Sequence, residues 1–394
     1  MNDVVLINNS RETFTRTHSG AIATCVDEMA RRAASGGVPL RIVTRRHADD
    51  SLSVLEHDRI TFLPPRRDER SGVLGRVDRA RRRLTGWARP DQWEYAHDVV
   101  QNLQAEPAAA VVVNNDPELA VHLRGVFKDV PVIHWFHNLE LASDRYRRAF
   151  TMDKGITSIA VSGYLARAVE QVYRMTPGAV VTSLNGVDAA AFGTGELRPD
   201  RVPVIGFLGR VAVEKGVDTF LEAALILADR GVGFDVQLVG DTDWGEHRAN
   251  PYSARVAALF DQLRATGVAV RALGHVQRAD LPAALAGSDI HVLPSRWDEP
   301  CSLALLEGMA SGQAIVATAT GGTPEVLGGV GSLVPREDAR ALADAVQLLV
   351  ESPERCLSMG NAARARAIEL SWEASWQRLS DVVAAAEAGA RSSR

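Results

Sequence analysis

The stretch "DIHVLPSRWDEPCSLALLEGMASGQAIVATA" (289–319) reads as a strand, a helix and a second strand. Its two ends, 289–295 and 314–319, are short apolar runs typical of buried parallel strands. Between them an apolar segment begins near Pro300, a residue suited to a first helical position, and ends at Gly312, which can cap a helix. The stretch therefore predicts one strand–helix–strand unit of an α/β fold.

The rest of the chain repeats this alternation in two series. Apolar runs of the first series occupy 4–8, 40–44, 109–114, 131–136 and 158–162, and those of the second occupy 202–209, 234–240, 268–274, 289–295 and 314–319. Amphipathic segments such as 21–36, 216–231 and 278–288 separate them. Strands that alternate with helices form parallel sheets, so we expect two doubly wound α/β domains. Ligands bind beyond the carboxyl ends of such strands, which predicts a site in a cleft between the domains.

The polar stretch "FGTGELRPDR" (192–201) marks the join between the two series. We therefore expect an N-terminal Rossmann-like domain over 1–190 and a C-terminal one over 191–371, followed by a final helix within 372–394.

Composition narrows the class of protein. The 394 residues are 46% hydrophobic and 24% charged, and the formal net charge of −5 argues against nucleic acid as the main partner. The three cysteines are far apart in the sequence, which favours a reduced protein without structural zinc. Neither a signal-peptide core at the N-terminus nor a run of 18 apolar residues is found, so we expect a cytoplasmic protein without a transmembrane helix.

The segment 64–90 is strongly basic and carries Trp87. It is interpreted either as a solvated helix face or lid, or as a docking surface for an acidic partner, with peripheral membrane contact through 66–89. Three acidic residues within the segment weaken the docking interpretation: Asp68, Glu69 and Asp78.

Two carboxylates flank the helix predicted in the first stretch. Glu299 precedes it and Glu307 lies on its second or third turn, so the rise of about 1.5 Å per residue separates them by roughly 12 Å along the axis. This is too far for one metal ion but suits two ends of an elongated ligand, with the N–H groups of the helix start as an anion site between them. A nucleotide sugar fits, through its ribose diol, its diphosphate and its sugar hydroxyls. The alternative is a helix-capping Glu299 and an incidental Glu307.

A loop between a predicted strand and helix carries two cations, Arg210 and Lys215, framed by Gly209 and Gly216. Lysine occurs otherwise only at 128 and 154. Cations at a strand end can neutralise the charge that develops on a departing diphosphate, as a metal ion would. Surface residues without a ligand are the alternative.

Three segments together resemble the retaining glycosyltransferases of family 4, which have the GT-B fold. They are "SLNGVDAAAF" (183–192), "GRVAVEKG" (209–216) and "VLPSRWDEPCSLALLEGMASGQAIVATATGGTPEV" (292–326). The NGVD segment, the R-x4-K loop and the E-x7-E pair occur in the family's order and spacing. Weaker similarity covers nearly the whole chain, including 19–44 and 371–379.

The resemblance implies a role for each of these residues. Arg210 and Lys215 would bind the donor diphosphate, Glu307 would hold the ribose, and Glu299 would contact the transferred sugar. Backbone groups would cradle the distal phosphate and sugar at Cys301, Ser302 and Leu303, and the base would rest near 273–276, which ends at Val276. The family usually has an aromatic residue and a glycine where this chain has Cys301 and Ser302, so the donor-sugar preference stays open.

The resemblance extends to the N-terminal domain. Gly20 matches a glycine whose loop approaches the donor phosphates, and His137 matches a histidine placed beside the reacting sugar. Asn115 and Asp116, at another strand end, are candidates for contact with the acceptor. In the family the final helix packs back onto the N-terminal domain.

The sequence gives little support to other sites. "DTD" (241–243) has the D-x-D pattern of metal-dependent glycosyltransferases, but it matches a turn that binds no metal in the family. "GGVG" (328–331) lacks the frame of a dinucleotide fingerprint, and no G-x-S-x-G is present. We therefore expect no metal and no cofactor.

The sequence thus predicts a retaining, metal-independent glycosyltransferase that uses a nucleotide sugar, UDP being the favoured carrier. The expected acceptor is a sugar-like or polyol molecule, in glycan or aminocyclitol-type biosynthesis. A nucleotide-sugar epimerase or hydrolase, and a non-catalytic nucleotide-sugar-binding protein, are the alternatives.

Overall fold

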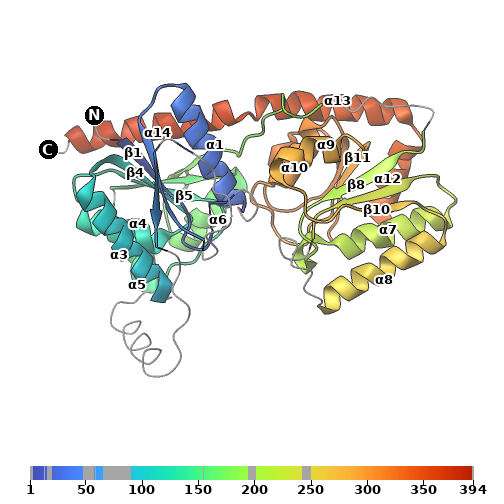
Figure 1. The fold of residues 1–394 in the computed structure, drawn as a ribbon, viewed down its shortest axis with the longest axis horizontal. Coiled ribbons are helices and arrows are strands. Elements are labelled where there is room, and N and C mark those ends of the chain that lie inside the picture. Colours follow the sequence, from blue (N-terminus) through green and yellow to red (C-terminus); the bar gives the residue numbers. More distant parts are fainter. Residues whose placement is uncertain are drawn as a thin grey trace. The chain divides into compact units, whose positions relative to one another are not determined.

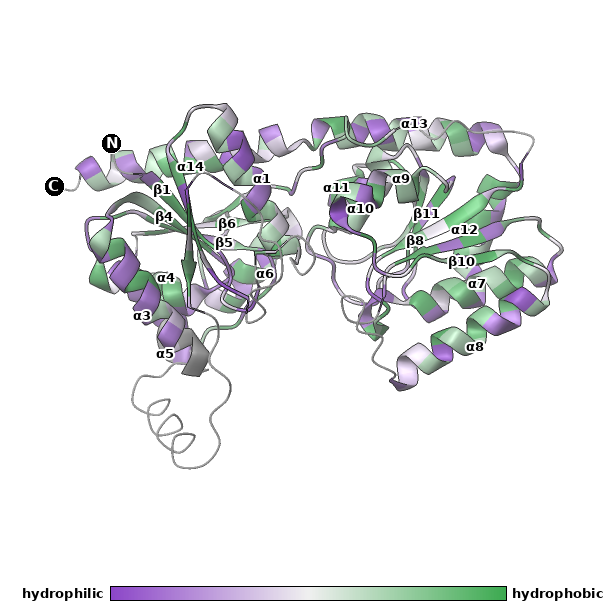
Figure 2. Ribbon diagram, viewed as in Figure 1, coloured by the Kyte–Doolittle hydropathy of each residue, from purple (hydrophilic) through white to green (hydrophobic). Residues whose placement is uncertain are grey.

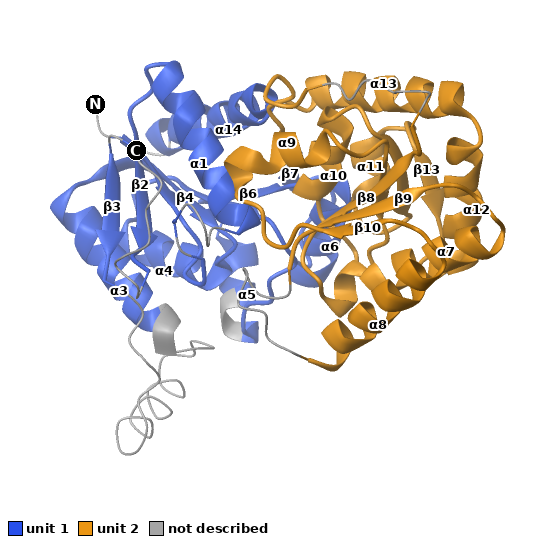
Figure 3. Ribbon diagram, turned by 45° about the vertical axis from the view of Figure 1, so that its right-hand side comes forward, with its two compact units in different colours: residues 1–184, 372–394 blue, residues 185–371 orange. Residues whose placement is uncertain are grey.

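The computed structural model describes residues 3–12, 14–15, 20–47, 57, 59–64, 90–153, 155–193, 201–241 and 250–392. The chain forms two compact units, Met1–Leu184 with Trp372–Arg394, and Asn185–Ser371 (Figure 3). Residues 65–89 of the basic segment, and with them the lid and membrane-docking interpretations, lie outside the described residues. So do 194–200 of the join and residues 242 and 243 of the D-x-D pattern.

The boundary between the units lies six residues earlier than the sequence suggested (184/185 instead of 190/191). Hydrogen bonds tie this short segment to the second unit: the Val187 N–H donates to the Leu370 carbonyl at 2.8 Å, and the Asn185 side chain donates to the Cys301 carbonyl at 3.1 Å. The NGVD segment is therefore part of the second unit rather than of the first.

The first unit contains a parallel sheet, in which β1, β4 and β5 are labelled in Figure 1. The order of its strands is β3-β2-β1-β4-β5-β6-β7. Its strands are β1 (Asp3–Ile7), β2 (Leu40–Arg45), β3 (Ile60–Leu63), β4 (Ala108–Asn114), β5 (Val132–Phe136), β6 (Ile156–Ala160) and β7 (Val180–Thr182). The central strands β1, β4 and β5 are buried almost throughout, as expected for strands covered on both faces.

Helices cover this sheet in two groups. They are α1 (Ala21–Ser35), α3 (Pro90–Ala105), α4 (Pro117–Val126), α5 (Asp144–Met152), α6 (Gly163–Tyr173) and the final helix α14 (Trp372–Ser392). Helix α14 packs along α1 and contacts β4 and β5, while α4 contacts both α3 and α5. The last helix of the chain therefore completes the first unit (Figure 1).

The second unit contains a parallel sheet with the order β10-β9-β8-β11-β12-β13. Its strands are β8 (Val204–Leu208), β9 (Asp235–Val239), β10 (Val270–Ala272), β11 (Ile290–Leu293), β12 (Ala314–Thr318) and β13 (Ser332–Val334). Its α-helices are α7 (Val217–Asp229), α8 (Pro251–Ala265), α9 (Leu281–Leu285), α10 (Leu303–Ala310), α11 (Thr323–Leu327), α12 (Ala339–Val350) and α13 (Pro353–Glu369). Two short 3₁₀ turns complete it, η1 (Val213–Lys215) and η2 (Arg278–Asp280).

Both units are doubly wound parallel α/β domains, which confirms the predicted fold class. Figure 2 shows that the strands are largely hydrophobic, whereas the outer helices carry both hydrophobic and hydrophilic residues and are amphipathic. The strands that the sequence did not reveal are β3, β7 and β13, which are three or four residues long. Each lies at the edge of its sheet and pairs on one side only. An edge strand needs no long apolar run, so periodicity in the sequence misses it.

Helix α10 begins three residues later than predicted, at Leu303 rather than at Pro300. Ser302 is its N-cap residue, with the side-chain oxygen accepting the Leu305 N–H at 3.3 Å. The cap ends the helix there, and the Cys301 carbonyl is held outside it by the Asn185 side chain. Glu299 consequently lies in an irregular loop, whereas Glu307 is in the middle of the helix.

Candidate functional site

The predicted donor-binding residues of the second unit come from loops that follow neighbouring strands. Strands β8 and β11 are paired, and the loops 209–216 and 294–302 leave their carboxyl ends. Because parallel strands end at the same edge of a sheet, these loops lie side by side. This edge is where ligands bind in open α/β sheets.

A glycine brings the two loops into contact. Gly216 has φ +66°, and a Cβ added to it would collide with the Pro294 carbonyl oxygen at the end of β11. Only a residue without a side chain allows this approach in a left-handed conformation. The preceding Lys215 is thereby directed towards the loop that carries Glu299.

Lys215 and Glu299 form a largely buried ion pair. The Lys215 Nζ lies 2.6 Å from Glu299 Oε1, and the two side chains are 19% and 4% exposed. Ser295 donates its hydroxyl to the same carboxylate oxygen at 2.6 Å, and the Lys215 ammonium lies 5.2 Å from the centre of the Trp297 ring. The Lys215 ammonium offsets the cost of removing the Glu299 carboxylate from water. The pair therefore fixes one positive and one negative charge beside the carboxyl ends of β8 and β11.

Arg210 is not part of this pair. Its guanidinium donates to Glu214 at 2.8 Å, and both side chains are about half exposed. Exposed ion pairs contribute only about 0.2–1 kcal/mol. The guanidinium can therefore leave Glu214 for a stronger anion at small cost. The structure puts Arg210 and Lys215 in one loop but gives them different partners.

Glu307 is held separately, by a residue that the sequence analysis did not identify. Arg278, at the start of η2, donates to Glu307 Oε1 at 2.7 Å. Burial raises the pKa of Glu307, and the Arg278 guanidinium acts in the opposite direction. Val276 precedes this arginine by two residues and is half-buried. One exposed arginine in a loop carries no signal in the sequence, since only the fold shows that it faces Glu307.

We expect Arg278→Ala to make the affinity for a nucleoside diphosphate depend on pH. Without the guanidinium the pKa of Glu307 rises further, so more of the carboxyl is protonated and fewer hydroxyl hydrogen bonds are accepted as the pH falls. Affinity measured by calorimetry should therefore fall more steeply with decreasing pH in the variant than in the wild type. Arg278→Lys should behave like the wild type; an equal pH dependence in all three proteins would contradict this role.

The start of α10 lies between Glu299 and Glu307 in the sequence, and it offers backbone N–H groups as hydrogen-bond donors. Among the described residues none accepts the N–H groups of Leu303 or Ala304, while Ser302 accepts that of Leu305. Asn185 fixes the peptide carbonyl of Cys301. Burial raises the pKa of the Cys301 thiol to about 12, so this cysteine is neutral and a poor nucleophile.

In the first unit, His137 follows the carboxyl end of β5 and is held by two asparagines. Its Nε2 lies 2.9 Å from the Asn114 side-chain oxygen, and its backbone N–H donates to Asn115 Oδ1 at 3.0 Å. Asn115 also accepts the Asn138 N–H at 2.9 Å and has φ +52°, a conformation that asparagine tolerates better than most residues. His137 and Asn115 are thus brought together; Asn114 was missed because it reads as the last residue of a strand.

Asp116 has a structural role in this arrangement. It is the N-cap of α4, and its Oδ1 accepts the Leu119 N–H at 3.0 Å. Burial raises its pKa to about 7, partly opposed by that hydrogen bond. A direct contact with an acceptor remains a proposal for this residue.

Gly20 precedes the first turn of α1, where a carboxylate of the same unit already lies. Glu12 Oε2 accepts the Ala23 N–H at 2.9 Å, and a Cβ on Gly20 would come within 2.6 Å of the Glu12 side chain. The N-terminus of α1 is therefore occupied by a carboxyl group supplied by the chain itself, and burial raises the pKa of this group. An approaching phosphate would compete with Glu12.

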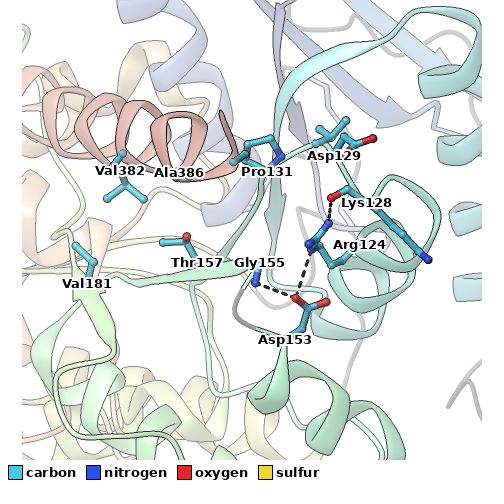
Figure 4. Close-up of a pocket in the computed structure, with 14 residues that line it drawn as sticks. Arg124, Lys128, Asp129, Pro131, Asp153, Gly155, Thr157, Val181, Val382 and Ala386 are labelled. Carbon is cyan, nitrogen blue, oxygen red and sulfur yellow. Dashed lines mark hydrogen bonds and ion pairs between the residues drawn. The ribbon is translucent and has the colours of Figure 1, made fainter. Parts of the chain in front are cut away.

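The first unit contains a cavity of about 730 Å³, and none of the predicted site residues lines it (Figure 4). Its lining includes Arg124, Lys128 and Asp153, and Val382 and Ala386 of α14. Lining residues 128–131 precede β5, and lining residues 153, 155 and 157 lie just before β6 or at its start, so the cavity is at the amino ends of these strands. It is therefore not the candidate site.

Two further properties concern the described part of the chain alone. Its side chains form no group of three or more His, Cys, Asp or Glu residues suited to a metal ion. None of its helices combines the length and apolar character needed to cross a membrane.

Comparison with known proteins identifies the family. A family model described as glycosyl transferases group 1 matches residues 202–352, in the second unit. An alpha-maltose-1-phosphate synthase of Mycobacterium tuberculosis is 30% identical over 302 residues, which are 67% of this chain and 76% of that protein.

Two other relatives are matched over less of their length. A D-inositol 3-phosphate glycosyltransferase of Corynebacterium aurimucosum is 27% identical over 65% of this chain and 66% of that protein. A glycogen synthase of Mycobacterium tuberculosis is 31% identical over 52% of this chain and 49% of that protein. The chain thus spans about two-thirds of the first of these relatives and about half of the second.

Solved structures agree on the fold. A sucrose-phosphate synthase from Thermosynechococcus elongatus has a TM-score of 0.73 and 20% identity, covering 97% of this chain and 98% of that one. HepE of Anabaena in complex with UDP has a TM-score of 0.70 and 20% identity, covering 98% and 100%. The chain therefore belongs to the group 1 glycosyltransferases and has the GT-B fold.

Proposed function

We propose that this protein transfers a sugar from a nucleoside diphosphate sugar to a hydroxyl of a polar acceptor, with retention of anomeric configuration. The proposal rests on one observation in the second unit, near the carboxyl ends of its strands. Glu299 and Glu307 are both buried there, and each is paired with a cation. Free N–H groups at the start of α10 lie between these carboxylates in the sequence. Charge and donors of this kind suit a diphosphate with a hydroxyl-bearing group at each end.

Each part of the donor has a counterpart among these residues in the proposal. Glu307 accepts hydrogen bonds from the ribose diol, and the base rests along 273–276. Arg210, Lys215 and the backbone at Cys301, Ser302 and Leu303 bind the diphosphate, while Glu299 contacts the transferred sugar. UDP is the favoured carrier, a choice that the UDP complex of the structurally similar HepE supports.

The proposed reaction is a front-face transfer. The bond from the anomeric carbon to the β-phosphate oxygen breaks, a bond to the acceptor oxygen forms on the same face, and the acceptor proton passes to the departing phosphate. Arg210 and Lys215 stabilise the charge on the leaving group, so no metal ion is required. His137, Glu299 and, near Gly20, the start of α1 orient the sugar and its phosphates.

The acceptor belongs to the proposal as well. The first unit supplies its site, with Asn115 and Asp116 as candidate contacts. A sugar-like or polyol acceptor agrees with the name of the relative from Corynebacterium, which points to an inositol phosphate. We favour a polar molecule of glycan or aminocyclitol-type biosynthesis.

Calorimetric titration of the protein with UDP, GDP and ADP, in the presence of EDTA, tests the donor site. Binding of one diphosphate without metal is the expected result and would identify the carrier. Absence of binding by all three would contradict the proposal.

Two other functions are separated by their products. A nucleotide-sugar epimerase or hydrolase would convert the donor without any acceptor, and a binding protein would leave it unchanged. Incubation of the donor with and without a panel of polyols, followed by mass spectrometry, distinguishes the three.

Arg210→Ala is expected to lower kcat by about 10- to 100-fold with a smaller effect on donor affinity, because charge on the diphosphate is greatest as it departs. Steady-state kinetics of transfer measures both effects. The folded state should be unaffected, since the Arg210–Glu214 pair is exposed. A near-normal kcat would remove Arg210 from the site.

A further inference from the structure

A buried asparagine determines which ring nitrogen of His137 carries the proton. Asn114, the last residue of β4, is fully buried and makes two hydrogen bonds through its side chain. Its Nδ2 donates to the Ile7 carbonyl at 2.9 Å, and its Oδ1 lies 2.9 Å from His137 Nε2. A carbonyl oxygen can only accept, so the amide nitrogen must face Ile7 and the amide oxygen must face the histidine.

We infer that Asn114 is a positioning residue that keeps His137 as the Nε2–H tautomer, leaving Nδ1 as a hydrogen-bond acceptor for a hydroxyl of the sugar or of the acceptor. Because Asn114 Oδ1 can only accept, the proton of the neutral ring has to be on Nε2. Among the described residues none forms a hydrogen bond with Nδ1. The inference rests on the proposed function, which supplies the hydroxyl.

The backbone around the ring is equally constrained. Asn115 Oδ1 accepts the N–H groups of both His137 and Asn138, and the Asn9 side chain donates to the Asn115 carbonyl at 3.1 Å. The ring also lies 5.0 Å from that of Trp135, centre to centre. Strand ends β1, β4 and β5 thus orient one imidazole, an arrangement that suits a precise contact with a substrate.

The charge state of the ring agrees with an accepting role. Burial lowers the pKa of His137 to about 3, so the ring is neutral at physiological pH. The neighbouring ring of His134 on β5 is also neutral, because burial lowers its pKa to about 3. Asp116 lies two residues after Asn114, at the start of α4, and burial raises its pKa to about 7. His137 therefore receives a hydrogen bond and does not protonate the leaving group.

Nitrogen-15 NMR of the imidazoles tests the tautomer without any measurement of turnover. Between about pH 6 and pH 8 the His137 signals should show the Nε2–H form with no titration. Asn114→Ala should lose this preference, giving a mixture of tautomers. An Nδ1–H ring, or a ring that titrates in this range, would overturn the inference whether or not the protein transfers sugar.

A matched pair of substitutions tests which nitrogen the substrate uses. The amide of His137→Asn lies where Nδ1 was, and that of His137→Gln reaches the position of Nε2. We expect His137→Asn to retain about 10-fold more kcat/KM than His137→Gln, roughly the worth of one hydrogen bond. Equal losses, or a better glutamine variant, would overturn the role of Nδ1; melting temperatures show that both variants fold. Absence of transfer in the wild type would contradict the proposed function itself.

Discussion

Replacing Lys215 by alanine is expected to reduce kcat/KM for sugar transfer by about 100- to 1,000-fold, the usual consequence of removing one group that stabilises developing negative charge. The lysine is more buried than Arg210 and is fixed by Glu299 and Trp297, so its charge needs little reorganisation when the diphosphate departs. Steady-state kinetics with the donor identified by calorimetry measures the effect. Lys128→Ala, at an exposed lysine of the first unit, is the matched control and should leave kcat/KM unchanged.

The same substitution should lower the melting temperature, because it leaves the Glu299 carboxylate buried without its cation. The double variant Lys215→Ala/Glu299→Gln removes that charge and should recover stability but not activity. Recovery of activity together with stability would mean that Lys215 acts only on the fold, and would contradict its role in leaving-group stabilisation.

Glu307→Ala is expected to weaken binding of the nucleoside diphosphate by about 100-fold. Two ribose hydroxyls would lose their acceptor, and hydrogen bonds to a charged group contribute about 1.5–3 kcal/mol each before any water replaces them. Because Arg278 is the more exposed partner of the pair, the loss of Glu307 leaves no buried cation behind. Calorimetry with the nucleoside diphosphate and thermal unfolding of the variant measure the two effects separately.

Inorganic pyrophosphate provides the control for this substitution, since it lacks a ribose. Its affinity should be the same for the wild type and for Glu307→Ala, whereas the nucleotide should distinguish them. Equal weakening of both ligands would show that Glu307 shapes the phosphate site rather than holding the ribose.

The alternation of strands and helices was legible in the sequence because buried parallel strands need unbroken apolar runs. The long central strands were therefore predicted, and the short edge strands β3, β7 and β13 were missed. The start of α10 was placed at Pro300 because proline suits a first helical position. The structure places it after Ser302, because a side-chain cap and the bond from Asn185 decide the matter.

Part of the candidate site was also predicted from a pattern along the chain. Arg210, Lys215, Glu299 and Glu307 have a spacing along the chain that identifies them. Four other residues were missed: Ser295 and Arg278, which contact Glu299 and Glu307, Asn114, which contacts His137, and Glu12, which contacts the start of α1. No motif records their spacing, since each meets its partner only through folding.

By itself the sequence determined the two α/β domains, their order and the residue types at the strand ends, because periodicity and spacing are properties of the chain. Only the tertiary structure decided which charges are paired: Glu299 forms an ion pair with Lys215, and Glu307 forms one with Arg278. It also decided which ring nitrogen of His137 bonds to Asn114 and which does not. These depend on distances between residues far apart in the chain and on their burial. Burial turns an ordinary carboxylate or imidazole into one with a fixed partner and a shifted pKa.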